Sequence, residues 1–117
     1  MTQTEKHELI ARELDGLYQN GLGQWMERNR DIVTLISLPN FTDQWHKVVE
    51  NIGTRRDVIS ITLIKQITGR WAVKILYEEI RPHEAYPRKQ EILRLSKELG
   101  EAVVNATVEY LQKGGGK

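Results

Sequence analysis

The sequence predicts an α+β domain in which an antiparallel sheet of three or four strands packs against two or three helices, the last of them long. Three observations support this class: a β-hairpin at about 58–78, an amphipathic helix that ends at Gly53, and an apolar stripe with helical spacing in the last third of the chain. An all-α bundle is the alternative. The length of 117 residues is typical of one domain, so we expect a single globular domain over 1–112 and a flexible tail over 113–117.

The hairpin is predicted by the pairing of its two strands. Gly69 in the left-handed conformation would close a three-residue loop over 67–69 as a type I turn with a bulge. Counting outwards from this loop gives three apolar pairs on one face: Leu63 with Val73, Ile61 with Ile75, and Ile59 with Tyr77. The other face is mixed, with Ser60, Thr62 and Lys74 among Val58, Ile64, Ala72 and Leu76. Because a slip of one residue would exchange the two faces, the register is well specified.

Two shorter helices are predicted before the hairpin. The first covers 3–18, with a capping box between Thr2 and Glu5 and a stop at Asn20 and Gly21. The second has Asn40 or Thr42 as its cap, and its apolar positions follow helical spacing at Trp45, Val48, Val49 and Ile52.

A third and longest helix is predicted from Pro87 to about Gln112. Proline suits the first turn of a helix, where its missing N–H is not needed. The apolar stripe of this segment comprises Ile92, Leu95, Leu99, Val103, Ala106 and Tyr110. At 1.5 Å per residue such a helix would be about 39 Å long, more than a small sheet needs for cover. The surplus length suggests a contact with a partner.

The segment 22–38 admits two interpretations. Asp31–Leu38 is short, rich in β-branched residues and followed by Pro39, which favours a strand paired with 22–28. The apolar residues at 22, 25, 32 and 36 also fit a helix that continues from the first one. The strand interpretation gives the order α-β-β-α-β-β-α.

Composition excludes several classes of protein. The chain has no cysteine, which excludes disulfides and cysteine-ligated metals. A hydrophobic content of 39% and a charged content of 28% are those of a globular protein and argue against disorder. The N-terminus lacks the apolar core of a signal peptide, and no run approaches the roughly 18 apolar residues of a membrane span. We therefore expect a cytoplasmic protein without membrane contact.

The residue types that perform catalysis are present but do not form a convincing group. His46 lies three residues after Asp43 and four before Glu50, a spacing that could hold a metal or a general base. An amphipathic helix, however, places polar residues on that side in any case. His83 lies in a connection, and His7 is expected to be exposed. The sequence thus favours a protein without catalytic activity, and it predicts no cofactor and no metal, with a small His-centred enzyme as the least favoured alternative.

Positive charge gathers around the hairpin. Residues 54–90 carry eight Lys or Arg and four Asp or Glu, a local charge of +4, whereas residues 1–53 sum to −3. Basic strands with an aromatic platform such as Trp71 can grip phosphates and stack bases. Nucleic-acid binding is therefore an alternative function, with Arg55, Arg56, Lys65, Arg70 and Lys74 as its candidate residues. The competing interpretation is that Trp71 caps the core with the Lys65 stem across it.

The favoured function is association with another protein. A sheet that is partly apolar on both faces needs cover on both faces, which helices or a partner can supply. We expect a small adaptor or subunit that binds a protein partner and forms a homodimer. The candidate interface residues are Leu76, Val104, Val108 and Leu111, together with Ile80 and Tyr86.

Overall fold

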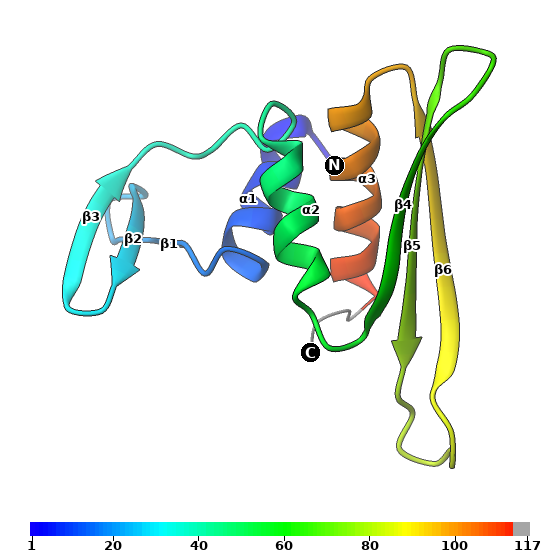
Figure 1. Cartoon of the computed structure of the whole chain (residues 1–117). Helices are drawn as coiled ribbons and strands as arrows, with labels where there is room; N and C mark the ends of the chain where they lie inside the picture. The colour runs from blue at the N-terminus through cyan, green and yellow to red at the C-terminus, as the bar shows by residue number, and fades with distance from the viewer. Residues whose placement is uncertain (114–117) are drawn as a thin grey trace.

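The computed structural model describes residues 1–113, and within them it has three helices and two three-stranded antiparallel sheets (Figure 1). In chain order the elements are α1 (Gln3–Glu13), β1 (Tyr18–Gln19), β2 (Trp25–Asn29), β3 (Ile32–Ile36), α2 (Trp45–Gly53), β4 (Val58–Lys65), β5 (Trp71–Glu79), β6 (Arg88–Ser96) and α3 (Leu99–Gln112). This confirms the predicted α+β class and excludes the all-α bundle. Residues 114–117, most of the predicted tail, lie outside the described residues.

The core lies between the β4-β5-β6 sheet and the helices. α3 packs on β5 and β6 with one side and on α1 and α2 with the other, so it is the middle layer (Figure 1). A helix in this position must be apolar nearly all round. Accordingly, the buried residues of α3 are Gly100, Ala102, Val103, Val104, Ala106, Thr107, Val108 and Tyr110.

The predicted hairpin is confirmed except at its open end. Gly69 has a φ of +87°, the Gln66 N–H donates to the Arg70 carbonyl at 2.8 Å, and the ladder pairs Leu63 with Val73 as predicted. The predicted pair of Ile59 with Tyr77 is wrong. A register shift between 58 and 60 places Val58 opposite Tyr77 and leaves Ile59 46% exposed. Such a bulge gives one extra residue to a strand, and strict alternation of the sequence does not reveal it.

The predicted helix from Pro87 to Gln112 is wrong in its first half. Residues 88–96 form β6, which pairs with β5 from Trp71–Ser96 to Glu79–Arg88, and the helix begins only at Leu99. Ile92, Leu95 and Leu99 fit helical spacing, and most of the segment consists of good helix formers. Pairing with the free edge of β5 overrides this local preference, as tertiary context often does.

The strand interpretation of 22–38 is confirmed. β2 and β3 pair regularly from Trp25–Ile36 to Asn29–Ile32, and β1 adds a third strand. We call residues 18–36 the arm, because Figure 1 shows β2 and β3 projecting to one side of the helices, away from the second sheet, while Trp25 at the base of the arm is buried in the core. The capping box of Thr2 and Glu5 is also present, but α1 ends at Glu13, earlier than predicted, and Gly16 with a φ of +69° follows it.

His7 is buried, contrary to the expectation that it is exposed. Its side chain is 8% exposed, it shares a hydrogen bond of 3.2 Å with the Thr42 hydroxyl, and it meets the Phe41 ring edge-on. Burial lowers the pKa of His7 from its ordinary value of 6.5, against an opposing effect of the Asp43 carboxylate and with a smaller lowering from Lys6. His7 therefore joins α1 to the turn before α2 in its neutral form.

Acidification below neutral pH is expected to destabilise the protein through His7. Because the folded-state pKa of His7 is lowered, the unfolded chain takes up the proton first, so stability falls as the pH drops through about 6.5. Urea unfolding at about pH 7.5 and about pH 5.5 should show a larger loss for the wild type than for His7→Gln. Asp15 does not explain such a loss of stability. Burial raises the pKa of Asp15, so its protonation at lower pH stabilises the folded state. Equal losses in both proteins would contradict this role of His7.

Candidate functional site

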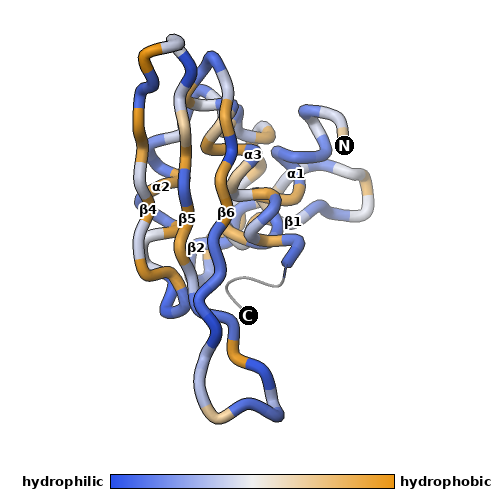
Figure 2. Tube along the Cα trace, turned by 90° about the vertical axis from the view of Figure 1, so that its right-hand side faces the viewer, coloured by the Kyte–Doolittle hydropathy of each residue, from blue (hydrophilic) through white to orange (hydrophobic). Residues whose placement is uncertain are grey.

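One face of the β4-β5-β6 sheet is covered by helices, and no described helix or strand covers the other. Figure 2 looks onto the uncovered face, with the helices behind the three strands. We call this the outer face; it carries Ser60, Thr62, Ile64, Ala72, Lys74, Leu76, Glu91, Leu93 and Leu95. Ile64 is 49% exposed, Leu93 53% and Leu95 45%, so the apolar part of this face remains in contact with solvent.

The outer face has an apolar end and a charged end. The pairing register aligns Ile64, Ala72 and Leu95 in one row across the three strands. Further along the sheet, the Lys74 ammonium lies 3.6 Å from the Glu91 carboxylate in an exposed ion pair. Exposed pairs of this kind contribute little to stability, so the row of apolar side chains is the feature of this face that needs explanation.

An open groove of about 720 Å³ runs beside β6, and we call it the β6 groove. β6 is an edge strand, because the sheet order is β4-β5-β6. The groove is lined by Met1, Lys6, Leu93, Arg94, Leu95, Asn105, Val108, Glu109 and Gln112. Its charged groups already have partners: Arg94 donates to Glu109 at 2.6 Å, and Lys6 to Asn105 at 2.7 Å. Among residues 1–113, the groove therefore offers a strand edge that has no partner strand, beside apolar surface, and its charged groups contact polar neighbours within the groove.

The structure does not bring the five candidate nucleic-acid-binding residues together. Arg55 and Arg56 precede β4, whereas Lys65 and Arg70 flank its far end, roughly 23 Å away at the usual rise per strand residue. Arg55 donates to the carbonyl oxygens of Glu13 and Leu14 and so holds the end of α1.

Lys65 and Lys74, the two lysines of the hairpin strands, also have neighbours. The Lys65 ammonium lies 5.8 Å from the centre of the Trp71 ring, and Lys74 is paired with Glu91. The position of Lys65 agrees with the interpretation that its stem packs across Trp71.

Two of the four predicted interface residues belong to the core. Val104 is 0% exposed and Val108 5%, because both sides of α3 are covered. Leu111 is half-buried and Leu76 lies on the outer face with partial exposure. The prediction of Val104 and Val108 as interface residues is therefore corrected. Leu93 and Leu95 were missed, because assigning their segment to a helix hid their alternation on a strand.

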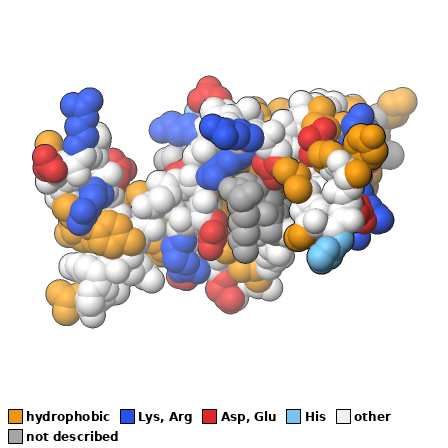
Figure 3. All heavy atoms as spheres, turned by 90° about the horizontal axis from the view of Figure 1, so that it is seen from below, with side chains coloured by type: hydrophobic (Ala, Val, Ile, Leu, Met, Phe, Trp, Pro, Cys, Tyr) orange, Lys and Arg blue, Asp and Glu red, His pale blue; other side chains and the backbone are white. Residues whose placement is uncertain are grey.

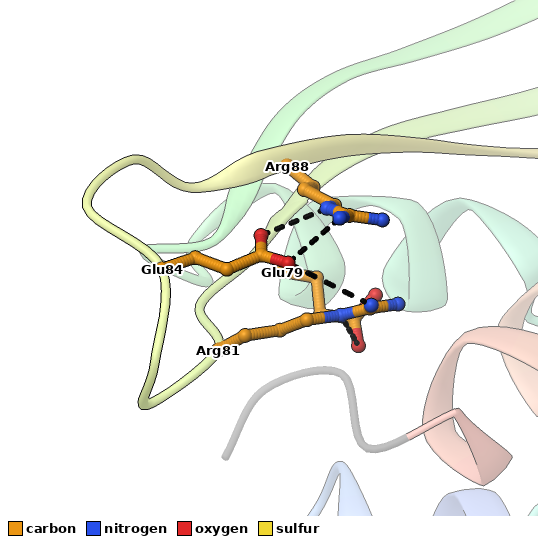
Figure 4. A network of polar contacts seen from close by, with 4 residues as sticks. All are labelled: Glu79, Arg81, Glu84 and Arg88. Carbon is orange, nitrogen blue, oxygen red and sulfur yellow. Dashed lines mark hydrogen bonds and ion pairs between the residues drawn. The ribbon is translucent and has the colours of Figure 1, made fainter.

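The connection between β5 and β6 carries the other two candidates, Ile80 and Tyr86, which are 80% and 83% exposed. Figure 4 shows the ion pairs that hold this connection. Glu84 accepts two hydrogen-bonded contacts from the Arg88 guanidinium, at 2.7 and 2.8 Å, and Arg81 reaches Glu79 at 3.3 Å. The network orders the connection while leaving its apolar side chains in solvent.

The histidine hypothesis gains no support from the geometry. Within residues 1–113 no group of three His, Cys, Asp or Glu side chains is arranged to hold a metal ion. His46 is exposed, with its ring edge-on to Trp45 at 5.9 Å. Among those same residues, each helix is too short or too polar to cross a lipid bilayer.

Comparison with known proteins gives no relative for this arrangement: no family model, no curated protein and no solved structure matches the chain.

Proposed function

We propose that this chain is a non-catalytic protein-binding domain that receives an extended segment of a partner protein along β6. The observation that carries the proposal is the nine-residue edge strand β6, with the β6 groove beside it and Leu93 and Leu95 exposed along it. Addition of a strand to a sheet edge is a common mode of peptide recognition. In this mode the backbone of the edge supplies affinity and neighbouring pockets select side chains.

The surface chemistry supports this function in two ways. Long apolar edges promote unwanted pairing, and proteins commonly protect them with charged side chains or with a covering element. β6 carries the charged residues Arg88, Lys89, Glu91 and Arg94, but Leu93 and Leu95 remain exposed in its second half. Exposed apolar patches with a polar rim are typical of interaction sites. An apolar segment of a partner protein fits this surface better than a nucleic acid does, since the basic residues are spread over both ends of the sheet.

The double variant Leu93→Glu/Leu95→Glu is expected to lose binding of the protein partner while keeping its fold. Full burial of a leucine is worth about 1.5–3 kcal/mol, and binding can bury only the exposed half of each side chain, so the loss of both leucines lowers affinity at least roughly tenfold. Immobilised wild-type and variant chains would be exposed to the same lysate, and the retained proteins compared by quantitative mass spectrometry. Circular dichroism of the variant should match that of the wild type, because both leucines are about half exposed.

Ile67→Glu is the matched control for this experiment. Ile67 lies at the tip of the β4–β5 hairpin and is fully exposed, so glutamate there adds one of the two negative charges of the double variant to the same sheet, away from β6. Proteins retained by the wild type and by Ile67→Glu, but not by the double variant, would be partners of the β6 surface. Equal retention by all three chains would sink the proposal.

A further inference from the structure

The arm presents a second edge strand, which has no partner among residues 1–113. β3 is the outer strand of the β1-β2-β3 sheet, so β2 occupies one side of its backbone and no described strand occupies the other. Its side chains are apolar and exposed on both faces: Ile32 is 68% exposed, Val33 44% and Leu35 57%. Figure 3 shows hydrophobic side chains gathered on the arm, at the left of that view.

β3 lacks the usual protection of an edge strand. Charged side chains, prolines and bulges normally prevent edges from pairing with other chains. From Ile32 to Leu38 the sequence has no charged residue and no proline, and the pairing with β2 contains no register shift. The free side of β3 is therefore a regular, apolar template for another strand.

We propose that β3 pairs antiparallel with β3 of a second copy of this chain, around a two-fold axis at Thr34. The sequence of β3, Ile-Val-Thr-Leu-Ile, is chemically symmetric about its central threonine. In this register Ile32 lies opposite Ile36 of the second copy, Val33 opposite Leu35, and Thr34 opposite its own equivalent. Apolar pairs and Thr–Thr pairs directly opposite each other stabilise antiparallel strands.

Neighbouring registers fit less well. Residues directly opposite each other in an antiparallel pair point to the same face of the sheet, so a two-fold axis perpendicular to the sheet must pass through a residue of β3. The nearest alternative registers are therefore centred on Val33 or Leu35. The first would place Asp31 opposite Leu35, and the second would place Asp31 opposite Pro39. Only the Thr34-centred register pairs every apolar residue of β3 with another apolar residue.

A second copy of this chain is the occupant of the free β3 edge because the sequence of β3 is complementary to itself. A two-fold contact uses the same patch on both chains and closes on itself, which prevents the open chains of strands that a free edge otherwise promotes. The two three-stranded sheets would join into one sheet of six strands. The arm and β6 lie on opposite sides of the molecule (Figure 1), so each copy in the dimer keeps its β6 groove free. This inference thus goes beyond the proposed function and uses a different surface.

Thr34→Glu is expected to convert the dimer into a monomer. Thr34 is exposed, so the change leaves the core intact, but it places two carboxylates opposite each other across the two-fold axis, with Glu27 of each copy on the adjacent strand. Light scattering over a dilution series should give twice the chain mass of 13.6 kDa for the wild type and a single chain mass for the variant. An equimolar mixture of Thr34→Glu and Thr34→Lys should dimerise again, because the two new charges are then opposite in sign.

Three results would overturn the inference: a wild type that is monomeric at every concentration, a Thr34→Glu variant that stays dimeric, or a folded mixture that stays monomeric. Leu93→Glu/Leu95→Glu serves as the control variant and should remain dimeric. Loss of the dimer in that variant instead would assign self-association to β6. The proposed β3 dimer and the proposed binding of other proteins at β6 are therefore tested independently of each other.

Discussion

Val104→Glu is expected to unfold the domain rather than to dissociate an oligomer. Val104 is 0% exposed in the middle layer, where α3 is covered by the sheet on one side and by α1 and α2 on the other. A buried carboxylate without a partner costs several kcal/mol. The free energy of unfolding should therefore fall by at least about 4 kcal/mol, a large part of the usual total of about 5–15 kcal/mol for a domain. Urea unfolding followed by the fluorescence of the three tryptophans measures this loss.

Gln112→Glu provides the control for the added charge. Gln112 lies in the last turn of the same helix and is exposed, so its replacement should change stability by no more than about 0.5 kcal/mol. If Val104→Glu instead kept wild-type stability and only halved the mass of an oligomer, Val104 would face a partner and the description of α3 as the buried middle layer would be wrong.

Local pairing rules are sufficient for the β4–β5 hairpin from its loop to Ser60, and insufficient for its open end and for β6. The hairpin is closed by a glycine with positive φ, and its apolar residues alternate, so its register follows from nearby residues alone. β6 contains a stretch, Glu-Ile-Leu-Arg-Leu, whose residues suit a helix as well as a strand. What decides its conformation is the free edge of β5, which is a property of the assembled sheet.

The interface residues of the candidate site also depend on contacts that form only in the assembled fold. Val104 and Val108 lie off the main apolar stripe predicted for the last helix, which suggested a second contact. Both residues are buried, but other elements of the same chain cover them. Leu76 is a candidate because it belongs to the predicted hairpin, whereas Leu93 and Leu95 become candidates only once β6 is recognised as a strand. Candidate interface residues were thus predictable only where the strand itself was predictable.

Gly100→Ala is expected to destabilise the protein although alanine is the better helix former. Gly100 is the second residue of α3 and is buried, and a Cβ placed on it would overlap the carbonyl oxygen of Thr42. Because the obstacle is backbone, it cannot be relieved by rotating a side chain. Thr42 also accepts a hydrogen bond from Gln3 and shares one with His7, so its displacement disturbs the contact with α1. Overpacking costs about 1–3 kcal/mol, enough to exceed the gain of about 1 kcal/mol in helix propensity.

Gly53→Ala distinguishes this close approach from a general effect of glycine replacement. Gly53 ends α2, and a Cβ added there meets nothing within 4 Å. Its replacement should leave stability unchanged or raise it by about 0.4–1 kcal/mol, because alanine restricts the unfolded chain more than glycine does. Thermal unfolding of the two variants should therefore shift in opposite directions or, at the least, show a loss for Gly100→Ala alone. A stabilised Gly100→Ala variant would mean that α3 and the turn at Thr42 are further apart than described, and that α3 is not held against the turn that His7 joins to α1.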